Sequence, residues 1–228
     1  MSARAASNRI DDRSIHRETS VVTVDAPNDL ALIHDPGVAL VHWQRAMPAA
    51  LREGLESTAD GTLPHVRFSA PLRAVEQATV AAFEAAGIGS SVARHLLIGD
   101  IVLLAILYSH VEQAEWLSVR LERIDHDACR KPHVDRVTTR LLCTYRGAGT
   151  EFGQTGVENE DWRCDLSLRR FDVGLVKGLL HPSARSSDTS KLLHRSPRFT
   201  ADSQERFLLC IGSAEPPRPR ARDAGLLH

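Results

Sequence analysis

The chain has 228 residues, of which 43% are apolar and 25% charged, and its formal net charge is -1 at pH 7. This composition is typical of a globular protein with a core of its own, built as one domain or as one domain with an extension. The near-neutral charge gives no strong field toward nucleic acid or an anionic membrane, so neither is expected as a partner.

Both ends of the chain are expected to lie outside the folded domain. Residues 1–20 are polar and have no apolar run, which predicts a disordered leader rather than a secretory signal. Residues 213–228 are rich in Pro and Arg and predict a flexible tail. We therefore expect a cytoplasmic protein, and the basic residues, nearly all of them Arg, indicate a bacterial source.

The first part of the domain predicts two short strands and then a helix. Residues 21–24 and 37–43 are short apolar runs that could be strands or edges. Residues 69–87 predict a helix, with Ser69 as N-cap and Gly87 just after its end.

A second, longer helix is predicted from about residue 91 to 115. Its apolar run is nearly continuous, so the helix should be well buried. Asp100 interrupts the run, and the uninterrupted apolar length is too short to span a bilayer.

The pattern changes after about residue 116 to short runs rich in β-branched and aromatic residues, separated by Gly, Pro, Asp and Ser. The clearest runs are WLSVRLERI, VTTRLLCTYRG, DVGLVKGLL and RFLLCIGS. Helices followed by a block of strands indicate an α+β fold. We expect one domain over residues 21–212, with helices at about 69–115 packed on a β core at about 116–212.

The four cysteines, Cys129, Cys143, Cys164 and Cys210, form no CxxC pair, so a zinc knuckle is not expected. We expect free, buried thiols. No GxSxG motif or phosphate-binding loop is present either.

Histidine and an acidic residue two positions apart occur three times, and such a pair could bind a metal. On a strand the two side chains share a face, whereas on a helix they lie about 200° apart and cannot share one ion. The pairs are His16/Glu18, His110/Glu112 and His133/Asp135. The first falls in the leader and the second in the long helix, so only the third precedes a strand. Taken alone, this pair could also be an ordinary polar patch.

A third ligand and an anion-binding residue follow at a suggestive spacing. His194 lies 61 residues after His133, and Arg206 lies 12 residues after His194 at the start of a strand. This order resembles the iron(II)/2-oxoglutarate-dependent oxygenases. The resemblance implies a double-stranded β-helix (a jelly roll, cupin-like) with an N-terminal helical layer. It also implies that His133, Asp135 and His194 bind iron(II), and that Arg206 pairs with a carboxylate of 2-oxoglutarate.

Alternation along the last strand favours Arg206 as the inward-facing residue. It places Arg206, Leu208 and Cys210 on one face and the more apolar Phe207, Leu209 and Ile211 on the other, which should meet the helices. Arg195 and Arg140 remain competitors for the role of anion anchor.

Tyr145 ends a predicted strand, and its hydroxyl could contact a bound acid as part of the cofactor site; a hydrogen-bonded structural tyrosine is the alternative. The motifs around it, CRKPHVDRVTTRLLCTYRGAGTEF, VGLVKG and HRSPRF, resemble a bacterial family described only as a domain of unknown function, DUF1826. The resemblance spans about residues 30–212. Pro132 and Ala148 depart from the family pattern without removing a ligand.

The sequence therefore predicts a non-haem iron(II), 2-oxoglutarate-dependent dioxygenase whose substrate, a small molecule or a protein, is unknown. The alternative is a barrel that binds zinc or another divalent ion in metal sensing or handling, because zinc competes well for such ligands. The sequence leaves the oligomeric state open.

Overall fold

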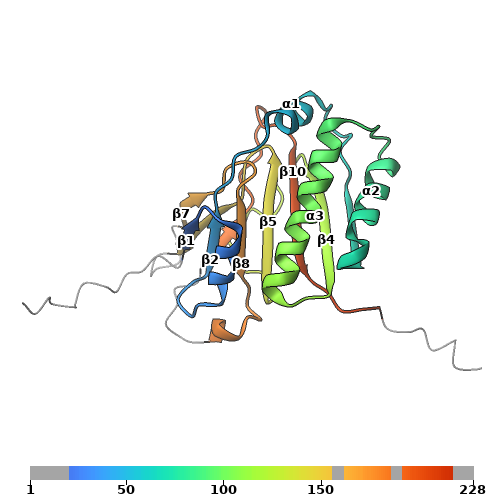
Figure 1. The fold of residues 1–228 in the computed structure, drawn as a ribbon. Helices are drawn as coiled ribbons and strands as arrows, with labels where there is room; N and C mark the ends of the chain where they lie inside the picture. Colours follow the sequence, from blue (N-terminus) through green and yellow to red (C-terminus); the bar gives the residue numbers. More distant parts are fainter. Residues whose placement is uncertain (1–20, 156–161, 186–191, 218–228) are drawn as a thin grey trace, which may run out of the picture.

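The computed structural model describes residues 21–155, 162–185 and 192–217, and within them two β-sheets and a layer of helices. Figure 1 shows the larger sheet, whose seven strands run in the order β1-β2-β8-β5-β10-β4-β3. Its strands are β1 (Val21–Val24), β2 (Leu40–Trp43), β3 (Val66–Pro71), β4 (Trp116–Ile124), β5 (Thr139–Arg146), β8 (Val173–Lys177) and β10 (Arg206–Ser213). Apart from the parallel pair β1 and β2, neighbouring strands are antiparallel.

The smaller sheet has the order β7-β6-β9 and is antiparallel. Its strands are β6 (Glu151–Thr155), β7 (Trp162–Ser167) and β9 (Leu193–Arg195). His133 extends it through an isolated bridge to His194 on β9. Side chains from both sheets, among them Leu142, Leu208 and Phe152, form one buried cluster. The two sheets therefore pack against each other.

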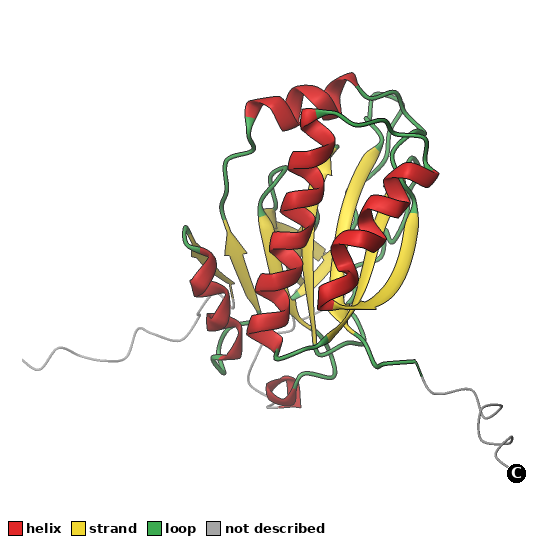
Figure 2. Ribbon diagram, turned by 45° about the vertical axis from the view of Figure 1, so that its right-hand side comes forward, coloured by secondary structure: helices red, strands yellow, loops and turns green. Residues whose placement is uncertain are grey.

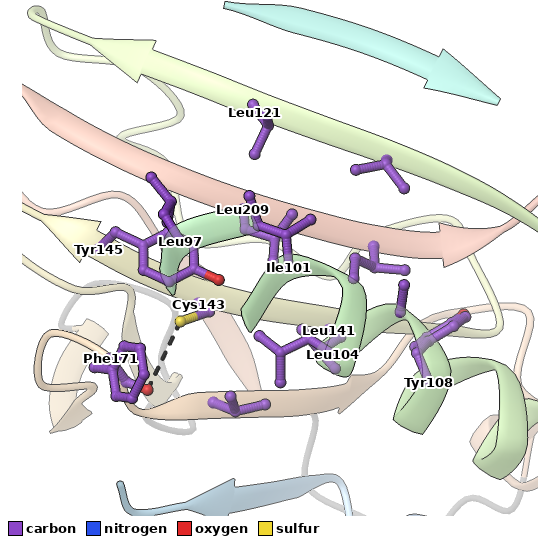
Figure 3. Close-up of a cluster of buried hydrophobic side chains, with 14 of the residues drawn as sticks. Leu97, Ile101, Leu104, Tyr108, Leu121, Leu141, Cys143, Tyr145, Phe171 and Leu209 are labelled. Carbon is purple, nitrogen blue, oxygen red and sulfur yellow. Dashed lines mark hydrogen bonds between the residues drawn. The ribbon is translucent and has the colours of Figure 1, made fainter. Parts of the chain in front are cut away.

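Helices cover the opposite face of the larger sheet, as Figure 2 shows. They are α1 (Ala49–Ser57), α2 (Val75–Ala85) and α3 (Val92–Glu112), accompanied by the short 3-10 helices η1 (Pro27–His34), η2 (Leu72–Ala74) and η3 (Pro182–Arg185). Leu97, Ile101 and Leu104 of α3 lie over Leu121, Leu141 and Leu209 of the sheet (Figure 3).

The alternation expected for β10 is confirmed. Phe207, Leu209 and Ile211 belong to the core beneath the helices, whereas Leu208 and Cys210 belong to the core between the sheets. Because side chains alternate strictly along a strand, the larger sheet separates a helix-facing side from a sheet-facing side.

Helix α3 behaves as a core helix. Its N-cap Ser91 accepts a hydrogen bond from the Arg94 amide, and Asp100 forms an ion pair with Arg45 at 2.6 Å. By length and composition alone, this helix of 21 residues could cross a membrane. Its inner face, however, packs on the sheet, and the core helix of a folded domain meets the same two criteria.

The fold is α+β, as expected, but its early part was predicted incorrectly. The proposed helix start at Ser69 is wrong: residues 66–71 form β3, and α2 begins only at Val75. Val66 and Ala70 of β3 are paired with residues of β4 and pack in the core beneath the helices. Tertiary pairing thus overrides the local helix signal.

The chain also does not order its helices before its strands. Strands β1, β2 and β3 precede α2 and complete the larger sheet, while α1, β6, β7 and β9 were not predicted as separate elements. The expected leader, residues 1–20, and most of the expected tail, residues 218–228, lie outside the described residues.

Candidate metal centre

Three side chains from two segments of the chain come together between the sheets. One ligand atom from each of His133, Asp135 and His194 lies within 4.8 Å of those from the other two. His194 Nε2 is 3.2 Å from Asp135 Oδ2, and His133 Nε2 is 3.7 Å from Asp135 Oδ1. The backbones of the two histidines exchange hydrogen bonds of 3.0 and 2.9 Å, which fixes the two rings side by side.

A hydrogen bond at Nδ1 of His133 leaves the other ring nitrogen, Nε2, free to bind a metal. Its Nδ1 donates a hydrogen bond to the carbonyl of Lys131 at 2.8 Å, because a carbonyl can only accept. In the neutral ring, Nε2 then keeps its lone pair and faces Asp135. In metal sites, a hydrogen bond from the ring nitrogen that does not bind the metal commonly orients the histidine ligand.

His194 is more deeply buried, with 7% of its surface exposed, and its ring packs on Phe152. Its Nδ1 is buried without a hydrogen-bond partner among the described residues. Two imidazoles and one carboxylate form the donor set that non-haem iron(II) sites use, and zinc accepts the same donors. The residues present therefore fit a divalent metal.

Asp135 is the carboxylate of this set. Burial raises its pKa, but the hydrogen bond and charge of His194, followed by the charges of Arg140 and His133, outweigh burial and hold the pKa at about 2. Arg140 donates to Asp135 Oδ2 at 2.6 Å. Asp135 is therefore ionised at neutral pH, as a metal ligand must be.

Arg206 lines one cavity together with these three side chains, and it has no acidic partner among the described residues. It is 4% exposed, and burial lowers the pKa of its guanidinium. Its hydrogen bonds go to hydroxyl groups: Thr150 at 2.6 Å, Ser196 at 3.0 Å and Thr144 at 3.4 Å. Its Nε is buried without a partner in the described chain, and no described carboxylate forms an ion pair with it. A buried cation without a counter-charge is costly, so this site is suited to an anionic ligand.

The two competing arginines already have carboxylate partners. Arg140 is bound to Asp135, and Arg195 Nε donates to Glu151 Oε2 at 2.7 Å. Among these three arginines, only Arg206 therefore has its charge available for a ligand.

Tyr145 lies elsewhere. It is 1% exposed in the core beneath the helices (Figure 3). Its hydroxyl donates to Asp100 at 2.7 Å. Because it points to the helix-facing side of β5, it does not line the cavity and is not part of the proposal below.

A cavity of about 330 Å³ joins these groups. The three candidate ligands line it together with Arg206, Thr150 and Ser196. The roles of Thr150 and Ser196 were missed, although each had a sequence signal: Ser196 follows His194 by two residues, and Thr150 ends the GAGT turn.

The cysteines are free in the described chain, but only two of the four match the expectation of burial. Cys143 and Cys210 are buried, while Cys129 and Cys164 are exposed. Burial raises the pKa of Cys143 to about 12 and that of Cys210 to about 11, so neither is a thiolate at neutral pH.

Comparison with solved structures shows which fold the chain shares. The dioxygenase for auxin oxidation 1 from Arabidopsis thaliana, in complex with 2-oxoglutarate, matches with a TM-score of 0.52 and 8% identity over 86% of this chain and 93% of that one. The rice dioxygenase for auxin oxidation matches with a TM-score of 0.50 and 11% identity over 87% of this chain and 84% of that one. At such low identity these matches show a similar fold.

At the level of sequence, the family model described as a protein of unknown function (DUF1826) matches residues 24–212. The chain therefore belongs to this family. The comparison with curated proteins found no significant match.

Proposed function

We propose that this protein is a non-haem iron(II), 2-oxoglutarate-dependent oxygenase. The observation that carries the proposal is the pairing, in one cavity, of a His-Asp-His cluster with a buried arginine that has no described acidic partner. The first fits a divalent metal with open coordination positions, and the second fits the far carboxylate of a dicarboxylate chelator.

The strand order supports a double-stranded β-helix as the framework. Within the larger sheet, β8, β5, β10 and β4 are consecutive and antiparallel. A second antiparallel layer faces these strands and consists of the His133 segment, β9, β6 and β7. The candidate ligands lie between two opposed antiparallel layers, the smaller of which has three strands extended by the His133 bridge, and this is the arrangement that the proposal requires.

The residues have separate tasks in the proposed reaction. His133, Asp135 and His194 hold the metal, and Arg206 with Thr150 and Ser196 binds and orients 2-oxoglutarate. Bound iron(II) supplies the activation of dioxygen that couples decarboxylation of 2-oxoglutarate to oxidation of a substrate. The protein contributes a fixed ligand set and a positively charged anchor in a buried site.

Anaerobic purification followed by metal analysis and calorimetric titration with 2-oxoglutarate tests the proposal. We expect one iron(II) per chain, 2-oxoglutarate binding that needs the metal, and production of succinate in air. His194→Ala should lose the metal, whereas Arg206→Gln should keep the metal and lose 2-oxoglutarate. Tight zinc binding without any response to 2-oxoglutarate would contradict the proposal and favour the alternative of metal sensing or handling.

The proposal includes a cytoplasmic location and a substrate that is neither nucleic acid nor membrane lipid. The near-neutral net charge supports the second part.

A further inference from the structure

The wall of the cavity carries information about the substrate, because it includes charged side chains that neither the metal nor 2-oxoglutarate needs. Arg120 and Glu122 line the cavity from β4. They are two residues apart, so both side chains lie on the same face of the strand. Across the ladder they pair with Cys210 and Leu208 of β10, which belong to the core between the sheets.

This pair is in direct contact and is partly exposed to solvent. Arg120 Nη1 lies 3.1 Å from Glu122 Oε1, and the two side chains are 19% and 26% exposed. The second carboxylate oxygen of Glu122 has no hydrogen-bond partner among the described residues. A cation and an anion therefore stand side by side on the wall, and each can accept another partner.

Among the described residues, the aromatic side chains that line the cavity are all histidines. All Phe, Trp and Tyr residues of the chain lie within the described ranges, and none of them lines the cavity. The described apolar lining consists of Ile124, Ala128, Leu142 and Leu208. Sites for aromatic ligands are usually lined by apolar and aromatic groups, so this wall is poorly suited to a flat aromatic substrate.

We propose that the primary substrate is a small aliphatic zwitterion of the amino-acid type, with its carboxylate on Arg120 and its ammonium on Glu122. This inference rests on the proposed function and names the substrate class of the same cavity. Arg120 and Glu122 already neutralise each other, so an uncharged substrate would displace water from both charged groups without replacing its hydrogen bonds. A singly charged substrate would be attracted to one member of the pair and repelled by the other. A zwitterion replaces that water at both positions.

Succinate production by the iron-loaded full chain, with a panel of the protein amino acids as probes, tests this inference. Each amino acid that stimulates turnover is compared with its deaminated acid and its decarboxylated amine, and indole acetic acid serves as an aromatic acid. We expect an aliphatic amino acid to give the largest kcat/KM, and each analogue lacking one charge to lose about tenfold to a hundredfold.

Two variants separate recognition from a merely structural role. Arg120→Gln should remove the preference for the amino acid over its decarboxylated amine, and Glu122→Gln the preference over its deaminated acid. A structural role would instead lower kcat/KM for all compounds by the same factor. Arg163→Gln, at an exposed position of β7, is the matched control and should change neither preference.

Several outcomes would overturn the inference: no response to any amino acid, the best turnover with indole acetic acid, or unchanged preferences in both variants. Binding of iron and 2-oxoglutarate is measured first in the unaltered chain. If that binding is absent, the proposed function itself fails; if it is present without the expected preferences, only the substrate class is wrong.

Discussion

Replacing Arg206 by methionine should affect ligand binding and stability in opposite directions. In the ligand-free protein this guanidinium is buried, 4% exposed, and bonded to three hydroxyl groups. Methionine replaces the aliphatic stem of arginine and carries no charge. The replacement removes a buried charge without a described acidic partner, at the expense of hydrogen bonds to neutral hydroxyl groups.

The magnitudes follow from this environment. Truncating one partner of a buried charged pair costs about 2–5 kcal/mol, so 2-oxoglutarate should bind about thirtyfold to several thousandfold more weakly. Replacing a buried ionic group by an apolar one is often neutral or stabilising, and about 1 kcal/mol moves Tm by about 2–4 °C in a chain of this size. The Tm of the ligand-free variant should therefore stay the same or rise.

Calorimetry with the manganese-loaded protein measures the affinity for 2-oxoglutarate, and thermal unfolding without ligand measures Tm. Arg195→Met is a matched control, because Arg195 has a carboxylate partner in Glu151 and lies over the Trp162 ring at 4.0 Å. This control should lower Tm and leave the affinity within about threefold. The reasoning is refuted if Arg206→Met lowers Tm by more than about 5 °C while the affinity stays unchanged, since Arg206 would then be a structural residue.

Three further predictions concern other contacts. Arg140→Ala removes the hydrogen bond to the candidate carboxylate ligand and should weaken manganese binding about tenfold to a hundredfold in a competition titration. Arg140→Lys should partly restore the affinity, and equal affinity in both variants would contradict a positioning role. Asp100→Asn leaves the Arg45 guanidinium without its carboxylate partner, so the free energy of unfolding in urea should fall by about 3–5 kcal/mol, and a loss below about 1 kcal/mol would show that the buried pair contributes little. At pH 8, a thiol reagent should modify the exposed Cys129 but not the buried Cys143, because a pKa of about 12 keeps the Cys143 thiol protonated at that pH. Rapid modification of Cys143 in the folded protein would show that this part of the core opens.

Much of the candidate site was accessible from spacing and alternation alone. The period of two along β10 assigned Arg206 to the side facing the smaller sheet, and the same rule made His133 and Asp135 the one plausible pair among three. Helix geometry excluded the pair at His110, which lies within α3. The positions of these residues in the structure agree with the inferences, because the inferences depend on local backbone geometry, which a short stretch of sequence encodes.

The inferences that failed depended on partners distant in sequence. Residues 66–71 carry helix-start signals, yet they form an edge strand because β4 offers them a hydrogen-bonding partner. Tyr145 was proposed for the cofactor site from its position at a strand end, but it shares the helix-facing side of β5 with Leu141 and Cys143, and its hydroxyl donates to Asp100 of α3. Strand β9 has only three residues, too few for a strand pattern in the sequence, and is defined by its pairing with β6.

The sequence by itself thus determined the α+β class, the candidate metal ligands and the face of β10 that carries the candidate anchor. Only the tertiary structure decided which arginine has its charge available, because that depends on which carboxylates the fold brings beside Arg140, Arg195 and Arg206. Local periodicity fixes the direction of a side chain along its own element. Whether a buried charge is neutralised depends instead on which residues from distant parts of the sequence lie beside it in the fold.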